Sequence, residues 1–157
     1  MIYAISGHRQ LSLSDAITIR YTLDDLGPSA SLIDSKLFPA TFYFGGAVGT
    51  DTVALEHCGT VYPKTRRIVV VPNQLKHQPP TAVQAIEHYA TDVIELNHRI
   101  TRIDAYEAYR IRNRYLVEHA DQLIAFCNLN RKSSGTQNAI LQALFLKKPY
   151  KVVHIDG

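Results

Sequence analysis

The chain has 157 residues, of which 46% are hydrophobic and 20% are charged, and its formal net charge is +3 at pH 7. This length and composition are typical of one folded, soluble domain and argue against a disordered, fibrous or multidomain chain. The small net charge argues against coating of nucleic acid by bulk attraction. No apolar stretch approaches the roughly 18 residues of a membrane span, so we expect a cytoplasmic protein without a membrane partner.

Short apolar runs alternate with segments that repeat apolar residues at helical spacing. The runs are bounded by glycine or proline, which is typical of strands that end in tight turns. The clearest strand, 67–72, is apolar at successive positions, as expected of a strand that is covered on both faces. In chain order we predict strand 2–5, helix 14–26, a polar loop at 29–36, strand 41–44, helix 50–59, strand 67–72, helix 82–89, strand 93–96, helix 104–119, strand 123–127, helix 135–146 and strand 150–155.

This alternation predicts one α/β domain over residues 1–157. It indicates a Rossmann-like, three-layer fold, with a mostly parallel sheet joined by right-handed crossovers and with helices on both faces. Side chains that accept hydrogen bonds mark the expected helix starts, and glycine marks an end. The expected caps are Ser14 or Asp15 for helix 14–26 and Asp104 for helix 104–119, while Thr50 or Asp51 opens helix 50–59 and Gly59 ends it.

The residue types that bind metals or form disulfides do not gather in the sequence. Cys58 and Cys127 stand at a helix end and in an apolar run, so we expect two buried free thiols and no disulfide. The histidines show no metal-ligand spacing with cysteine or carboxylate partners, so we expect no metal site and no further cofactor.

Three glycine-containing turns, 6–9, 45–51 and 133–136, follow predicted strands. In parallel sheets ligands bind beyond the carboxyl ends of the strands, and a glycine turn before a helix offers backbone amides to a phosphate. Each turn by itself is equally well explained by the backbone bend that glycine permits. Together they predict an anion site for a nucleotide or other phosphorylated small molecule. The candidate ligand-binding residues are Ser6, Gly7, Arg9, Gly45, Gly46, Gly49, Thr50, Asp51, Arg112, Asn113, Arg114, Ser134, Gly135 and Thr136.

The second turn lacks the dinucleotide pattern GxGxxG and the lysine of the P-loop, which argues against a dehydrogenase or an NTPase. Asp51 has two interpretations, a helix cap or an acceptor for a ribose hydroxyl, and the glycine-rich turn slightly favours the second. On helix 104–119, Arg110 and Arg114 share one face whereas Arg112 points elsewhere, so all three cannot meet one ligand. We expect Arg110 to lie on a solvated face or to pair with Glu107, Glu118 or Asp121.

These motifs together resemble the SLOG superfamily, which includes the Smf/DprA DNA-processing proteins, the LOG-type phosphoribohydrolases and small YpsA- or YspA-like nucleotide-binding proteins. The resemblance rests on the turns at 6–9 and 45–51, Arg112-Asn113-Arg114, the run at 120–126 and Ser134-Gly135-Thr136. It implies a Rossmann-like fold, a nucleotide-type ligand at these motifs and self-association into homo-oligomers. LOG-type enzymes carry GGxGTxxE, whereas here Gln137-Asn138-Ala139 follows Thr136 without a carboxylate.

Three functions follow in order of preference. The first is a module that binds a nucleotide or nucleotide derivative. The second is an enzyme that cleaves an N-glycosidic bond of a nucleotide, with Asp51 or Glu56 as candidate catalytic carboxylates, although a solvated helix carboxylate is the more ordinary role for Glu56. The third is a DprA-like binder of single-stranded DNA, which the modest charge favours least.

Overall fold

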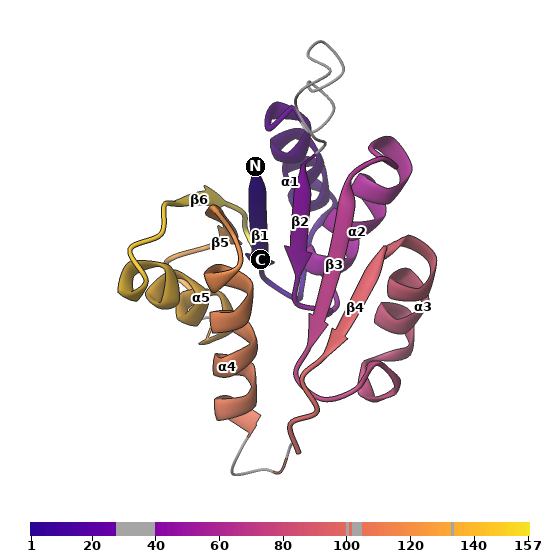
Figure 1. Cartoon of the computed structure of the whole chain (residues 1–157). Helices are drawn as coiled ribbons and strands as arrows, with labels where there is room; N and C mark the ends of the chain where they lie inside the picture. Colours follow the sequence, from indigo (N-terminus) through magenta and orange to yellow (C-terminus); the bar gives the residue numbers. More distant parts are fainter. Residues whose placement is uncertain (28–39, 100, 102–104, 133) are drawn as a thin grey trace.

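The computed structural model describes residues 1–27, 40–99, 101, 105–132 and 134–157, so the predicted loop 29–36 and the expected cap Asp104 fall outside it. Its strands and helices alternate in the predicted order (Figure 1). The strands are β1 (Ile2–Gly7), β2 (Thr41–Phe44), β3 (Arg66–Val71), β4 (Asp92–Glu95), β5 (Gln122–Cys127) and β6 (Tyr150–His154). The helices are α1 (Leu13–Asp25), α2 (Thr50–Val61), α3 (Pro80–Tyr89), α4 (Ala105–Glu118) and α5 (Ser134–Phe145), with a short 3-10 turn at Leu75–His77.

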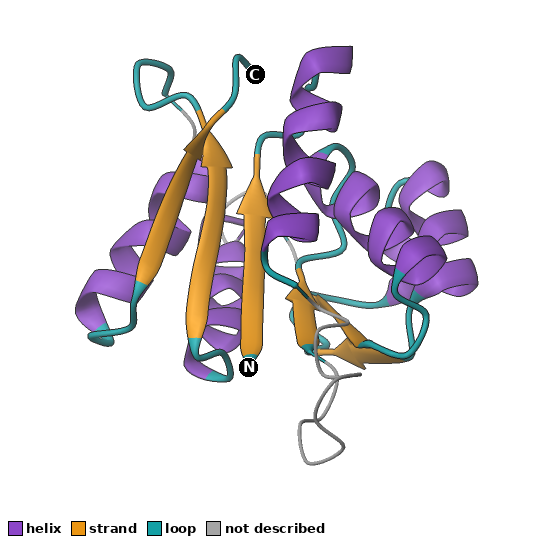
Figure 2. Ribbon diagram, turned by 90° about the horizontal axis from the view of Figure 1, so that it is seen from above, coloured by secondary structure: helices purple, strands orange, loops and turns teal. Residues whose placement is uncertain are grey.

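The six strands form one parallel sheet in the order β4-β3-β2-β1-β5-β6. The chain builds outward from β1 to β4 and then returns through α4 to place β5 on the other side of β1. The direction of winding therefore reverses between β1 and β5, which is the position where open α/β sheets bind ligands. Figure 2 shows the strands side by side with helices on both sides of the sheet, which confirms the predicted Rossmann-like fold.

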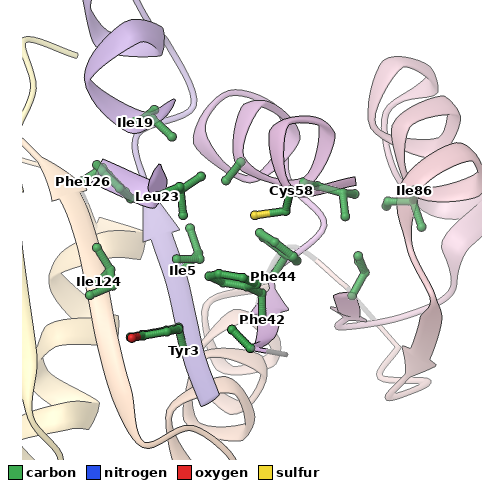
Figure 3. Packing of buried hydrophobic residues seen from close by; sticks show 14 of the residues in the cluster. Tyr3, Ile5, Ile19, Leu23, Phe42, Phe44, Cys58, Ile86, Ile124 and Phe126 are labelled. Atoms are coloured by element: carbon green, nitrogen blue, oxygen red, sulfur yellow. The ribbon is translucent and has the colours of Figure 1, made fainter. Parts of the chain in front are cut away.

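One face of the sheet is covered by α1, α2 and α3, and the larger apolar cluster lies there. Ile5, Phe42 and Phe44 point from the strands toward Leu23 of α1 and Cys58 of α2 (Figure 3). Burial of large apolar side chains is the main favourable contribution to folding. This cluster therefore holds the three helices against the sheet.

The opposite face carries α4 and α5 on smaller side chains, among them Ala4, Ala125, Ala139 and Ala143. Successive strand residues point to opposite faces, so β3 contributes Ile68 and Val70 to this cluster and Val69 and Val71 to the larger one. The continuous apolar run at 67–72 predicted this double burial correctly.

Two helix ends differ from the sequence predictions. The N-cap of α1 is Ser12 instead of Ser14 or Asp15: its Oγ accepts from the Asp15 amide (3.1 Å), and Asp15 Oδ2 accepts from the Ser12 amide (3.0 Å). Asp15 is thus the partner in a capping box. Helix α2 begins at Thr50 as expected but continues past Gly59, where an added Cβ would lie 2.7 Å from Cδ1 of Tyr89. Gly59 lets α3 approach closely instead of ending the helix.

Cys58 and Cys127 are both buried and free, as predicted. Burial raises the pKa of the Cys58 thiol to about 12, so it stays protonated at neutral pH. Within the described ranges, no helix combines the length and apolar character that a bilayer crossing requires.

Candidate functional site

A cavity of about 640 Å³ opens beyond the carboxyl ends of the neighbouring strands β1 and β5. Its walls come from the loop after β1, the start of α2, one side of α4, the loop after β5 and the start of α5. Eight of the predicted ligand-binding residues line it, namely Ser6, Gly7, Arg9, Asp51, Arg112, Asn113, Gly135 and Thr136. The volume lies within the range of small-molecule sites, roughly 300–1,000 Å³.

Other candidates lie outside the cavity. Arg114 is exposed, and its Nε lies 3.9 Å from Oε1 of Glu118 one turn further along α4. Glu56 is exposed on α2 and does not line the cavity. Ser134 is the first residue of α5, and its side chain falls outside the described part of the structure.

Gly46 faces the hydrophobic core instead of the cavity. Its φ is +73°, and a Cβ placed there would lie 2.8 Å from Cγ1 of Val71 and 3.1 Å from Cγ1 of Val69. Only glycine adopts such a backbone readily at so close a contact. The sequence identified a position that requires glycine, and the cause in this structure is core packing.

Gly7, Gly49 and Thr50 fasten the loop after β1 to the start of α2. Both the amide and the hydroxyl of Thr50 donate to the carbonyl of His8, at 3.1 and 2.9 Å. A Cβ on Gly7 would lie 2.3 Å from Thr50 Oγ1, and one on Gly49 would lie 2.2 Å from the carbonyl oxygen of Arg9. These close contacts fix two cavity walls relative to one another.

Gly45 lies between the two charged groups at the centre of the cavity. Its carbonyl accepts a hydrogen bond from Nη1 of Arg112, and an added Cβ would lie 2.9 Å from that nitrogen and 3.1 Å from Oδ2 of Asp51. Oδ2 accepts from the amide of Ala47 (3.1 Å). Oδ1 of Asp51 is buried and has no hydrogen-bond partner among the described residues.

Burial shifts the pKa values of both central groups toward their neutral forms. Desolvation raises the pKa of Asp51, and the nearby Arg112 and the amides of Ala47 and Gly45 oppose that rise. Desolvation also lowers the pKa of Arg112, opposed by Asp51 and reinforced by Arg9. Opposite shifts of this kind in one cavity are typical of functional sites, although structural ion pairs produce them as well.

The ring of Tyr109 on α4 lies against two of the cationic side chains of the cavity. The guanidinium carbons of Arg9 and Arg112 lie 5.5 and 5.4 Å from its ring centroid, within the range of cation–π attraction. Among the described lining residues, five are cationic and Asp51 is the single carboxylate; the five are Arg9, Arg110, Arg112, Arg131 and Lys132. Cationic side chains therefore outnumber acidic ones among the described lining residues.

Asn113 connects α4 to the start of α5. Its Nδ2 donates to the carbonyl of Gly135 and to Oδ1 of Asn138, each at 3.2 Å, and its Oδ1 accepts from Nε of Arg112 (3.1 Å). It is almost fully buried, at 3% exposure. Asn113 thus holds the α5 N-terminus beside the arginine, and its role in ligand contact stays a prediction.

His8 lines the cavity as a neutral imidazole. The backbone amide of Asn128 donates to its Nε2 (2.7 Å), which leaves the proton on Nδ1. Burial lowers the pKa of His8, the positive charge of Arg131 lowers it further, and Asp15 opposes the shift. Arg110 lines the cavity too, while its Nε donates to Oε2 of Glu107 (3.0 Å), the pairing that the sequence predicted.

Sequence reasoning missed several lining residues, including Tyr106, Tyr109, Arg131, Lys132 and Asn138. Arg131 and Lys132 follow β5 in the chain, so the rule that directed attention to glycine turns after strands could have found them. Tyr109 stands three residues before Arg112 on the same helix, where i,i+3 side chains meet. Nothing in the sequence alone points to its contact with Arg9.

No family model matches the sequence, and no curated protein is significantly similar to it. Among solved structures, DNA processing protein A from Helicobacter pylori, described for its single-stranded DNA binding mode, superposes with a TM-score of 0.68 at 21% identity. The match covers 97% of this chain and 64% of that one. DNA processing protein A (DprA) from Streptococcus pneumoniae also gives 0.68, at 17% identity, over 99% of this chain and 50% of that one.

The chain spans less than two thirds of the length of either DNA processing protein. At these identities the likeness concerns the fold. The chain has a DprA-like Rossmann fold, in agreement with the fold that the resemblance to the SLOG superfamily implies.

Proposed function

We propose that this chain is a binding module for a nucleotide or nucleotide derivative, held in the cavity beyond the carboxyl ends of β1 and β5. The observation that supports the proposal is the unmet acceptor at Asp51. This residue lines a cavity rich in cationic side chains, and its buried Oδ1 has no donor among the described residues. An unsatisfied buried acceptor costs about 1–3 kcal/mol. A ligand that brings both a hydroxyl donor and an anion would relieve this cost and complement the charge, and a nucleotide carries both on its sugar phosphate.

The phosphate is assigned to the start of α5. Apart from its chain neighbours and its own helix, no atom of the described residues lies within 4 Å of a Cβ placed on Gly135, and Arg131 and Lys132 line the same cavity. Helix N-termini attract anions through unpaired amides and the helix dipole. The sugar would then lie toward Asp51 and Arg112.

The test is isothermal titration calorimetry with a panel of nucleoside 5′-monophosphates. Asp51→Asn keeps the size of the side chain but removes its charge, and loss of a charge-assisted hydrogen bond of about 1.5–3 kcal/mol weakens affinity about 10- to 150-fold. Glu56→Gln is the matched control, because the same chemical change falls on an exposed position of the same helix. Equal affinity of the two variants, or no binding by the wild type, contradicts the proposal.

Incubation of the protein with the same panel of nucleoside 5′-monophosphates tests the enzymatic alternative. An N-glycosidase would release free base over time, visible by chromatography, and Asp51→Asn would abolish the release. Binding of a nucleotide without release of free base supports the binding module over the enzyme. Of the two candidate carboxylates, Asp51 lines the cavity and Glu56 does not, so the test of this alternative uses Asp51.

Single-stranded DNA is the second candidate ligand, favoured by the five cationic lining residues and by the fold shared with a protein described for single-stranded DNA binding. Binding through phosphates weakens steeply with salt, since each neutralised phosphate releases counterions. Affinity for a fluorescent oligonucleotide should then fall by orders of magnitude between 50 and 200 mM salt, values at which about 10³–10⁵-fold losses occur for six to ten phosphate contacts. Binding that is absent or insensitive to salt excludes this candidate.

A further inference from the structure

A second, smaller recess of about 210 Å³ adjoins the cavity on its β3 side. Arg9, Ala47, Tyr109 and Arg112 line both spaces. The shared wall is thus the aromatic ring with its two guanidinium groups. Any ligand that occupies both spaces must pass this doubly cationic wall.

The far side of the recess is formed by the loop after β3. Nε2 of Gln78 donates to Oδ1 of Asn73 (2.6 Å) and to the carbonyl of Gln74 (3.1 Å), which orients both side-chain amides. The donor Nδ2 of Asn73 and the acceptor Oε1 of Gln78 have no hydrogen-bond partner among the described residues. Val48 and Pro79 complete the recess with apolar surface.

A paired amide donor and acceptor beside apolar surface is the chemistry that reads the edge of a nucleobase, as asparagine and glutamine do with adenine. The volume lies below the roughly 300 Å³ at which sites for drug-sized ligands begin, so it suits a single ring system. A cationic wall between a base-sized recess and a larger cavity fits a phosphate bridge between two nucleosides.

We infer that the site takes a ligand with two nucleoside halves joined by phosphate, with the second base in the recess and the bridge over Arg9 and Arg112. This rests on the proposed nucleotide site and extends it from one nucleoside to two, with the bridging phosphate at Arg9 and Arg112 instead of at the start of α5. Two sources carry this chemistry, a free dinucleotide and two consecutive nucleotides of a single strand.

Calorimetry with AMP, diadenosine diphosphate, the dinucleoside monophosphate ApA and an oligo-dA 12-mer tests the inference. A bridged ligand should bind about tenfold or more tightly than AMP, a ratio that corresponds to 1.4 kcal/mol. Tighter binding of the free dinucleotide than of the 12-mer identifies the first source, and the reverse order identifies the second. Equal affinity for AMP and for every bridged ligand overturns the inference and leaves the proposed function standing. Binding of none of them overturns the inference, and it overturns the proposed function as well if the panel of nucleoside 5′-monophosphates also shows no binding.

Variants in the recess provide an independent readout. Gln78→Ala and the exposed His77→Ala should weaken the bridged ligand and leave AMP unchanged, whereas Gln74→Ala, an amide of the same loop outside the recess, should change neither. His77 has no side-chain hydrogen bond to another described residue, so its variant tests the recess even if Gln78→Ala loses stability. If His77→Ala weakens the binding of AMP and of the bridged ligand by the same factor, the recess does not act as a separate subsite for the second base.

Discussion

At the scale of single residues, the glycines that suggested a phosphate site have different roles. Gly7 and Gly49 permit contact between loops, Gly46 packs on the core, and Gly135 faces open space beside the cavity. The sequence shows that each position lacks a side chain. It does not show which neighbour a Cβ would meet, because that neighbour comes from a distant part of the chain.

Gly46 and Gly135 should therefore respond in opposite ways to alanine. Gly46→Ala forces a positive φ on a residue with a Cβ and presses it against Val71, so we expect a loss of about 1–3 kcal/mol in the free energy of unfolding. Gly135→Ala adds a methyl to open space in a helix and should leave stability unchanged or raise it by up to about 1 kcal/mol. Urea denaturation followed by circular dichroism measures both. Similar losses in the two variants would show that the packing at Gly46 is not the cause.

Asp15 should make stability depend on pH. It is 2% exposed, and its carboxylate accepts from the amides of Ser12, Asp156 and Gly157. Burial by itself would raise its pKa, but these hydrogen bonds, with one from the Ser12 hydroxyl, lower it below the ordinary value. A carboxyl with a lowered folded-state pKa stabilises fully above its unfolded pKa, and the contribution is lost as pH falls toward the folded value.

Asp15→Asn should consequently cost about 2–3 kcal/mol at pH 7, because several buried amides lose a charged acceptor. The difference from the wild type should shrink as pH falls below about 4, because the carboxyl of the unfolded wild-type chain becomes protonated there and that of the folded chain only at lower pH. Urea midpoints from pH 7 down to pH 3 give the comparison, with Asp25→Asn on the same helix as control. A difference that stays constant with pH would contradict the ionised role of Asp15.

At the scale of elements, the order and type of the helices and strands were predictable because each has a local signal. The apolar run of β3 and the helical spacing in α4 are examples. The errors lie where tertiary contact overrides local preference. The sequence predicts that Gly59 ends a helix, but in the structure this glycine leaves room for the ring of Tyr89. It predicts Asp15 as an N-cap, but the Asp15 carboxylate accepts hydrogen bonds from the amide of Ser12 and from the segment after β6.

The junction between β1 and α2 should depend on the Thr50 hydroxyl. Thr50→Val keeps the shape but replaces the donor to His8 with a methyl group against a carbonyl, so we expect a loss of about 1–3 kcal/mol. Thr50→Ser keeps the donor and should lose less. Chemical denaturation of both variants measures these losses. If the valine variant is as stable as the serine variant, the hydrogen bond from the Thr50 hydroxyl does not stabilise the junction.

At the scale of the whole molecule, the sequence predicted that the candidate residues gather at one sheet edge, and eight of them line the cavity there, but the sequence could not select those eight. The sequence places Arg112 and Arg114 on different faces of α4 but does not show which face meets the cavity; Arg112 reaches Gly45 from a buried position, while Arg114 is exposed near Glu118. The rotation of α4 on the sheet decides between them. Self-association, which the resemblance to the SLOG superfamily implies, stays a prediction.

The two apolar clusters lie on opposite faces of one sheet and share its strands, so we expect the chain to unfold in a single transition. Leu23 of α1 and Leu116 of α4 are at 0% and 3% exposure in different clusters, and truncation of either to alanine should cost about 2–5 kcal/mol. Because β3 sends alternate residues into both clusters, loss of packing on one face weakens the strand that supports the other. Each variant should therefore lower the same Tm, by about 2–4 °C for each kcal/mol in a chain of this size.

Differential scanning calorimetry tests this cooperativity directly, since equal calorimetric and van't Hoff enthalpies mark a two-state transition. Far-UV circular dichroism supplies a second probe, which matters because the chain has no tryptophan. If Leu116→Ala split the transition while Leu23→Ala shifted it whole, the α4–α5 layer would be an independent unit. The cavity, whose walls come from α2 on one face and from α4 and α5 on the other, would then open before the larger core unfolds. A single shared transition instead means that the site persists until the whole domain unfolds.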